Sequence, residues 1–274
     1  MCVQSSKQHE NHIHTTHGFK TFESLFLFDV LRTTTTTTTT TYIHTYTHTY
    51  IHTYIHKQDG NNNAISPWHD IELEGKRQGE FNFVCEVPKI TKAKMEIDTK
   101  STNNPIVQDT KKGALRYYHG PIYWNYGCIP QTWEDPSVRN SEVDCFGDND
   151  PLDVVEIGSS TLEMGSVTSI KPLGILSMID DGELDWKLIA IDANDPLANE
   201  LNDVNDVEAK LPGTISGIRE WFRWYKVPDG KPLNQFGHGE VALSRDVAME
   251  VIEETHEFWK NLREGKADQG KLWL

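Results

Sequence analysis

The 274-residue chain has few cysteines, no long apolar run and no excess of basic residues. Its four cysteines form no C-x-x-C pair and have no histidine near them at zinc-finger spacing, which argues against a disulfide framework and a zinc finger. No stretch approaches the roughly 20 apolar residues that a membrane-spanning helix requires. Lys and Arg number 26 against 41 Asp and Glu, so the formal charge of -15 disfavours nucleic acid as a partner and favours a cation.

The cysteine usage and the start of the chain favour a cytoplasmic protein. We expect the cysteines to be reduced and mostly buried thiols. The chain opens without the charged start and apolar run of a secretory signal peptide. An organellar form is the alternative, because the neutral stretch that opens the chain is compatible with a degenerate presequence.

Residues 1–63 differ in composition from the rest of the chain. They hold eight of the twelve histidines, none of the eight tryptophans, and a nine-residue threonine run at 33–41. A four-residue repeat of the form YIHT or YTHT follows from Tyr42, and its period fits neither a helix nor a strand. We expect a disordered, low-complexity tail here, with a histidine-rich metal site as the alternative.

Residues 64–274 carry the whole net charge, because the acidic and basic residues of 1–63 cancel. Short β-prone runs separated by turns come first, at 81–87, 154–157, 174–178 and 187–191. Helical patterns come late: one after a Ser244 N-cap that ends near Gly265, and one at 214–224. This order predicts an α+β fold, mainly β, in which an antiparallel sheet or barrel carries flanking helices.

Three aspartates are crowded into one short stretch, as Asp148, Asp150 and Asp153. Ionised carboxylates this close repel one another, and a hard cation such as Mg²⁺, Mn²⁺ or Ca²⁺ would offset the repulsion. A solvated acidic turn is the alternative. An EF-hand is excluded because its fifth, sixth and twelfth positions fall on Leu152, Asp153 and Ser159. A D-x-D-x-T phosphatase motif also fails at Leu152.

A second acidic group spans residues 180–185 and is followed at once by Lys187. Carboxylates alone hold a metal, whereas interleaved basic residues also accept a polyanion that the metal bridges. Lys94, Arg116 and Lys226 are candidates for that role, although each taken singly is by base rate a surface charge. Phosphate is the obvious polyanion.

The sequence from residue 66 to about 260 resembles the soluble family I inorganic pyrophosphatases of the eukaryotic type. The stretch GDNDPLDV at 147–154 is similar to the family signature D-x-D-P-x-D-V. Other blocks of the family occur in the same order: WHDI at 68–71, EVP at 86–88, AKMEI at 93–97, QDTKKG at 108–113, NYG at 125–127, PQTWEDP at 130–136, DWK at 185–187 and WFRWYKVPDGKP at 221–232. A lone D-x-D-x-x-D is weak evidence, whereas this many ordered blocks are specific.

The resemblance implies a five-stranded OB-like barrel with flanking helices, and a catalytic domain over residues 64–274. It implies hydrolysis of pyrophosphate to two phosphates by several Mg²⁺ ions, with Mn²⁺ as a substitute, and a metal-activated water whose proton Asp150 accepts. The implied metal-binding residues are Asp148, Asp150, Asp153, Asp180, Asp185, Glu96 and Glu86. The implied phosphate-contacting residues are Lys94, Arg116, Tyr126, Lys187, Tyr225 and Lys226.

The chain departs from the family in two places. Between Arg116 and Tyr126 it is several residues shorter than expected. The family's other phosphate-contacting tyrosine lies in that loop, and Tyr123 is the candidate replacement. Lys89 and Ile90 stand where the family usually has an Arg-Trp pair that contributes to a homodimer.

Two other functions stay open at this point. The altered loop motivates a catalytically weak scaffold subunit that binds protein partners through the barrel and the tail. The acidic clusters are also compatible with a general phosphatase that acts on phosphate monoesters. The preferred prediction is a Mg²⁺-dependent inorganic pyrophosphatase.

Overall fold

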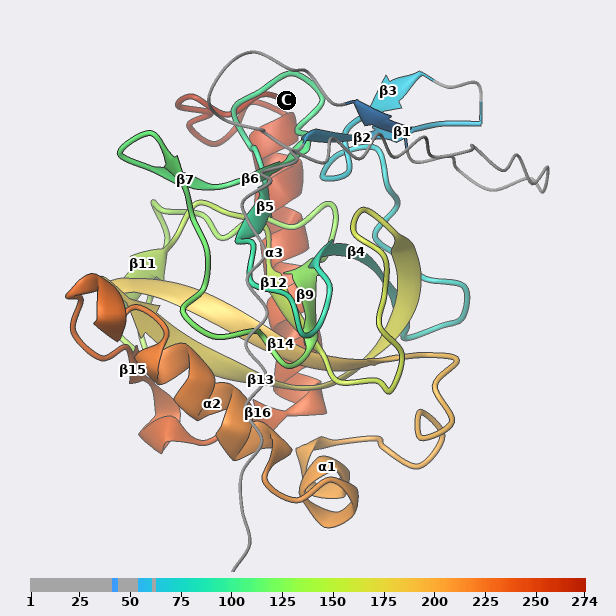
Figure 1. The fold of residues 1–274 in the computed structure, drawn as a ribbon, viewed down its shortest axis with the longest axis vertical. Coiled ribbons are helices and arrows are strands. Elements are labelled where there is room, and N and C mark those ends of the chain that lie inside the picture. Colours follow the sequence, from blue (N-terminus) through green and yellow to red (C-terminus); the bar gives the residue numbers. More distant parts are fainter. Residues whose placement is uncertain (1–40, 44–53, 61–62) are drawn as a thin grey trace, which may run out of the picture. The chain divides into compact units, whose positions relative to one another are not determined.

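The computed structural model describes residues 41–43, 54–60 and 63–274, all within the unit Thr37–Leu274 (Figure 1). Two described pieces of the N-terminal segment form strands, β1 (Thr41–Ile43) and β2 (Tyr54–Gln58), which pair with each other. The structure therefore has strands in two short stretches where disorder was expected. The rest of the prediction for residues 1–63 lies almost wholly outside the described residues.

Five strands form a ring of paired neighbours. They are β4 (Phe81–Val87), β9 (Asn125–Cys128), β12 (Asp153–Glu156), β13 (Val167–Asp180) and β14 (Glu183–Asp192). β4 pairs with β9, β9 with β12, β12 with β14, β14 with β13, and β13 returns to β4. Only the β12–β14 pair is parallel. The predicted five-stranded, OB-like barrel is confirmed.

The five barrel strands are buried along most of their length, on both faces. Successive residues of a strand point to opposite faces. Along β14, Leu188 and Ala190 enter one apolar cluster, whereas Ile189 and Ile191 enter the other. The wall of the barrel therefore separates two apolar cores.

Three helices follow or flank the barrel: α1 (Val204–Lys210), α2 (Thr214–Trp224) and α3 (Arg245–Arg263). Ile215, Ile218 and Phe222 of α2 are spaced three and four residues apart and enter the first core. The long helix α3 runs beside β13 and supplies the second core (Figure 1). The side chain of Ser244 accepts a hydrogen bond from the Val247 amide, which confirms the predicted N-cap. The helix α1 was not predicted.

Short strands and 3-10 turns complete the fold. They are β3 (Ala64–Ile65), β5 (Met95–Ile97), β6 (Ile106–Gln108), β7 (Thr110–Lys111), β8 (Ala114–Leu115), β10 (Arg139–Asn140), β11 (Cys145–Gly147), β15 (Gln235–Phe236), β16 (Leu243–Ser244), η1 (Val227–Asp229) and η2 (His238–Glu240). β7 and β8 form a hairpin beside β5 and β6. Within the part of the chain that the structure describes, no helix has the length and hydrophobicity of a membrane span.

The close approach of β4 and β9 generates a prediction about stability. A Cβ atom at Gly127 would lie 2.0 Å from the Val84 carbonyl oxygen and 2.8 Å from the Glu86 amide nitrogen. The backbone must move to admit it, so Gly127→Ala should lower the free energy of unfolding by at least about 2 kcal/mol. Urea denaturation measures the change.

Gly120→Ala is the matched control, because a Cβ atom there meets no other atom within 4 Å. Its free energy of unfolding should stay within about 0.5 kcal/mol of the parent protein. Equal losses in the two variants would show that the close contact between β4 and β9 does not limit the fold.

Candidate active site

A cleft with a volume of about 550 Å³ lies beside the barrel, between the strands and the end of α2. Apart from Tyr123, the candidate replacement in the shortened loop, the predicted metal-binding and phosphate-contacting residues all line it: Glu86, Lys94, Glu96, Arg116, Tyr126, Asp148, Asp150, Asp153, Asp180, Asp185, Lys187, Tyr225 and Lys226. These residues come from segments that are far apart in the sequence. The fold therefore brings these residues into one place.

The parallel pairing of β12 with β14 organises the centre of the cleft. Asp153 is the register partner of Lys187, and Asp185 lies two residues away on the same face of β14. The Lys187 ammonium group donates hydrogen bonds to both carboxylates and, at 3.0 Å, to the Tyr126 hydroxyl. Lys187 is only 2% exposed, and a buried charge requires such partners.

The electrostatics of this group keep the lysine charged. Burial opposes the charge of Lys187, but Asp153 and Asp185 outweigh burial and raise its pKa above the ordinary value. The Tyr126 hydroxyl donates to Asp153. Lysine, tyrosine and two carboxylates thus form one connected polar network.

The loop between β11 and β12 holds Asp148 and Asp150 through backbone contacts with Glu134. The Glu134 amide donates to the Asp150 carbonyl at 2.9 Å, and the Asn149 amide donates to the Glu134 carbonyl at 2.9 Å. Gly147 lies so close to this backbone that a Cβ atom there would be 2.6 Å from the Glu134 carbonyl carbon. The glycine and the asparagine of the GDND stretch therefore fix where the two aspartates stand.

Asp148, Asp150 and Asp185 resist ionisation. Burial, followed by the charges of Asp185 and Asp150, raises the pKa of Asp148 well above its usual range. Burial raises the pKa of Asp150 to about 7, with the charges of Glu96 and Asp153 adding to the effect. Burial likewise raises the pKa of Asp185 to about 7, although Lys187 opposes the rise.

Glu86 lies below this group, on β4. It is 5% exposed, and one of its oxygens accepts a hydrogen bond of 2.8 Å from the Ile97 amide. Burial and the charge of Asp153 raise its pKa well above the usual range. Its environment is that of an accessory acid in the same pocket.

Basic side chains also line the cleft, and each pairs with a carboxylate. Lys94 pairs with Glu96 and, at 3.2 Å, with Asp109, and Asp109 also pairs with Arg116. These cations outweigh the effect of burial and lower the pKa of Asp109. Asp109 was not predicted from the sequence, although it lies in the QDTKKG block.

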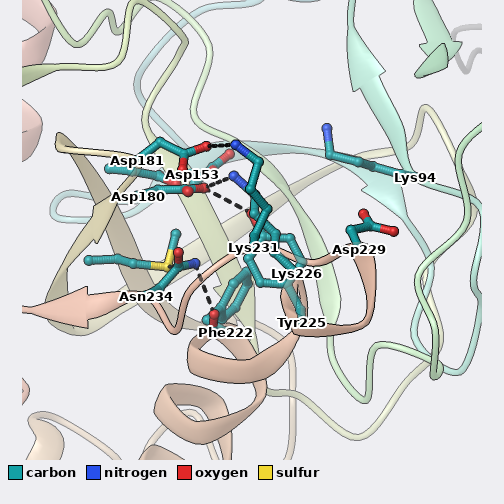
Figure 2. Close-up of polar contacts among 12 residues, drawn as sticks. Lys94, Asp153, Asp180, Asp181, Phe222, Tyr225, Lys226, Asp229, Lys231 and Asn234 are labelled. Carbon is teal, nitrogen blue, oxygen red and sulfur yellow. Dashed lines mark hydrogen bonds and ion pairs between the residues drawn. The ribbon is translucent and has the colours of Figure 1, made fainter. Parts of the chain in front are cut away.

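The end of α2 contributes the remaining pair. Figure 2 shows that Asp180 accepts hydrogen bonds from Lys226 and from the Tyr225 hydroxyl, the latter at 3.0 Å. The neighbouring Asp181 pairs with Lys231 at 2.8 Å. The turn between β13 and β14 is therefore linked to the segment that follows α2.

The donor set fits a hard divalent cation, although the carboxylates now face lysines. Among the described residues, no three His, Cys, Asp or Glu side chains are already arranged to hold a metal ion. One oxygen of Asp180, Oδ1, is buried and has no hydrogen-bond partner in this part of the chain. Buried oxygens without partners are unfavourable, and a cation that the oxygens share would satisfy them and offset their repulsion.

The shortened loop places its tyrosines differently from the prediction. Tyr123 is 55% exposed and does not line the cleft, whereas Tyr118 is 7% exposed and does. Burial raises the pKa of Tyr118 to about 12. The sequence did not indicate Tyr118, because its place in the cleft depends on hydrogen bonds with residues 92–94, which are distant in the sequence.

Comparison with known proteins gives the family. The family model described as inorganic pyrophosphatase matches residues 83–260. The soluble inorganic pyrophosphatase 6, chloroplastic, of Arabidopsis thaliana is 56% identical over 217 residues, which cover 79% of this chain and 72% of the relative. An inorganic pyrophosphatase of Eremothecium gossypii is 51% identical over 215 residues, or 76% of this chain and 75% of the relative.

Solved structures agree with the sequence relatives. The crystal structure of type I inorganic pyrophosphatase from Toxoplasma gondii has a TM-score of 0.77 and 46% identity, and covers 82% of this chain and all of the other. A truncated vacuolar soluble pyrophosphatase from Trypanosoma cruzi, solved in complex with PPi, has a TM-score of 0.75 and 39% identity over 89% of this chain and 98% of that one. This chain therefore belongs to the inorganic pyrophosphatase family.

Proposed function

We propose that this chain hydrolyses inorganic pyrophosphate to two phosphates, and that residues 64–274 form the catalytic domain. The observation that carries the proposal is the cleft, where crowded carboxylates face lysines, an arginine and tyrosines. Carboxylates bind cations, and the basic and hydroxyl groups bind phosphate oxygens. Membership of the inorganic pyrophosphatase family supports the same substrate.

The family implies a divalent metal cofactor, and we propose Mg²⁺ with Mn²⁺ as a substitute. Such a cation, when bound, neutralises phosphate oxygens and lowers the pKa of water toward neutrality. The residues that would hold the cations are Asp148, Asp150, Asp153, Asp180 and Asp185, with Glu96 and Glu86 as outer carboxylates.

The chain's own side chains supply the rest of the chemistry. Asp150 is the proposed acceptor of the proton from the attacking water, because it lines the cleft together with Asp148 and Asp153. Lys94, Arg116 and Lys226 would give up part of their pairing with carboxylates to bind phosphate oxygens. Positive charge at these oxygens stabilises the negative charge that develops on the leaving phosphate.

Two tyrosines and the central lysine orient the phosphate groups. The hydroxyls of Tyr126 and Tyr225 now donate to Asp153 and Asp180, and each would turn to a phosphate oxygen once cations bind those carboxylates. The Lys187 ammonium group donates to the Tyr126 hydroxyl at 3.0 Å. The scaffold alternative loses its motivation, because the altered loop leaves the predicted site residues other than Tyr123 in the cleft.

A homodimer and a cytoplasmic location are further proposals. Ile90 is 63% exposed, its amide donates to the Ile122 carbonyl at 2.6 Å, and the neighbouring Tyr123 is 55% exposed. This apolar surface supports an interface between two copies. An organellar form is the alternative to the cytoplasm, since relatives from Arabidopsis thaliana and Chlamydomonas reinhardtii carry the word chloroplastic in their names.

The first test is an assay of phosphate release from pyrophosphate. The purified full chain should release phosphate with Mg²⁺ present, and EDTA should abolish the release. Asp150→Asn removes the proposed proton acceptor and should lower kcat by about 10²- to 10⁴-fold. Asp268→Asn, at an exposed position outside the cleft, is the matched control and should leave kcat unchanged.

Two results of this assay would contradict the proposal. One is absence of phosphate release by the folded parent chain. The other is faster hydrolysis of phosphate monoesters than of pyrophosphate, which would favour a general phosphatase.

A second test measures protons released when Mg²⁺ binds. The pKa values of about 7 for Asp150 and Asp185 mean that both carboxyls are largely protonated below pH 7 and must ionise to bind a cation. Affinity for Mg²⁺ should therefore rise between pH 6 and pH 8, and binding at pH 6.5 should release protons. Calorimetric titrations in buffers of different ionisation enthalpy measure the release. Affinity that is independent of pH would contradict the assignment of these two ligands.

A further inference from the structure

The start of the shortened loop is an extended segment that runs beside residues 92–94, just before β5. The Lys94 amide donates to the Arg116 carbonyl at 3.2 Å, and the Tyr118 amide donates to the Lys92 carbonyl at 2.7 Å. Alternate side chains of an extended segment point to the same side. Arg116 and Tyr118 accordingly both line the cleft, whereas Tyr117 between them is 58% exposed.

The ring of Tyr118 is held in place by aromatic neighbours. It makes edge-to-face contacts with Trp221 at a centroid distance of 5.0 Å and with Tyr225 at 6.1 Å. The Trp221 indole donates a hydrogen bond of 3.0 Å to the Pro121 carbonyl, which ties the loop to α2. The ring contacts with Trp221 and Tyr225, together with the hydrogen bond from Trp221 to the loop, thus fix the position of the Tyr118 ring.

The Tyr118 hydroxyl differs from the other two tyrosine hydroxyls of the cleft. Tyr126 donates to Asp153 and Tyr225 donates to Asp180, whereas the Tyr118 hydroxyl forms no hydrogen bond with any other described residue. It is also not among the fully inaccessible unpaired atoms of this part of the chain, so it keeps accessible surface in the cleft. This donor is free to bind a ligand.

The charges around this hydroxyl suit an anion that carries cations. Lys94 and Lys187 lie close enough to interact with it electrostatically, and so do Asp153 and Glu86. The two ammonium groups, and cations bound to the carboxylates, would attract a phosphate oxygen. The Tyr118 hydroxyl would then donate a hydrogen bond to that oxygen without adding charge. Tyrosine hydroxyls supply such a donor without adding charge.

We propose that Tyr118 donates a hydrogen bond to a phosphate oxygen of the substrate and replaces the phosphate-contacting tyrosine that the shortened loop lacks. The inference rests on the proposed function and deepens it, because it names a further substrate-binding residue. Tyr123, the replacement expected from the sequence, lies outside the cleft and does not take this role. In this chain the tyrosine contact with phosphate would therefore come from Tyr118, near the start of the loop, and not from Tyr123, near its end.

The experiment compares three phenylalanine variants of the full chain: Tyr118→Phe, Tyr117→Phe and Tyr123→Phe. Each loses one hydroxyl and keeps its ring, so Tyr118→Phe retains the packing against Trp221 and Tyr225. Two quantities are measured for each variant. They are kcat and KM for pyrophosphate with Mg²⁺, and the dissociation constant of inorganic phosphate with Mg²⁺ by calorimetry.

Tyr118→Phe should lower kcat/KM and weaken phosphate binding by roughly ten- to a hundredfold, the usual effect of losing one hydrogen bond to a charged group. Tyr117→Phe and Tyr123→Phe should stay within about twofold of the parent protein, because neither hydroxyl faces the cleft. The midpoint of thermal unfolding of Tyr118→Phe should match the parent, which separates loss of a ligand contact from loss of structure.

Two outcomes overturn the proposal. One is a Tyr118→Phe variant whose kinetics and phosphate affinity remain within about twofold of the parent. The other is an equal or larger loss in Tyr123→Phe. If the parent chain binds phosphate and does not hydrolyse pyrophosphate, the proposed function fails, and the phosphate titration still decides the role of Tyr118.

Discussion

Repulsion between crowded carboxylates that share one cleft is the constraint on which the rest of the site depends. Asp148, Asp150 and Asp185 hold their protons to unusually high pH because burial and neighbouring charge disfavour ionisation. Lys187 offsets part of the repulsion through Asp153 and Asp185. The remainder requires mobile cations, and a substrate with several phosphate oxygens is the anion that such cations bridge. The acidity of the chain and its binding of a polyanion are therefore compatible.

The barrel fixes the positions of the charged side chains at the centre of the cleft. Its single parallel pair of strands sets Asp153 opposite Lys187, and the close contact of β9 with β4 places Tyr126 beside them. The backbone of Glu134 holds the loop of Asp148 and Asp150 from outside the barrel. Many of the functional side chains thus come from strands, or from a loop held by backbone hydrogen bonds, whereas Tyr225 and Lys226 follow α2, so the cleft is largely formed before ligands bind.

Local sequence patterns predicted the elements that depend on local physics. Phe81–Val87 and Thr214–Trp224 match their predicted ranges, since apolar runs and helical spacing are read within each segment. The strand Val167–Asp180 extends well beyond the predicted 174–178. Its first half contains polar residues, so its sequence does not read as a strand, although it pairs with both β4 and β14. The family motifs identified most of the site residues. The position of Tyr118 in the cleft depends on backbone hydrogen bonds with residues 92–94, and the spacing of the motifs does not predict those bonds.

The most direct test of the central claim is a crystal structure of the full chain with Mn²⁺ and phosphate, with anomalous scattering used to locate the metal. The account predicts two cations about 3.5 to 4 Å apart, the separation typical of two-metal hydrolases. They should contact Asp148, Asp150 and Asp153 after these side chains have turned from their present partners. A cleft that binds phosphate through its basic residues and shows no anomalous peak among the carboxylates would contradict the account.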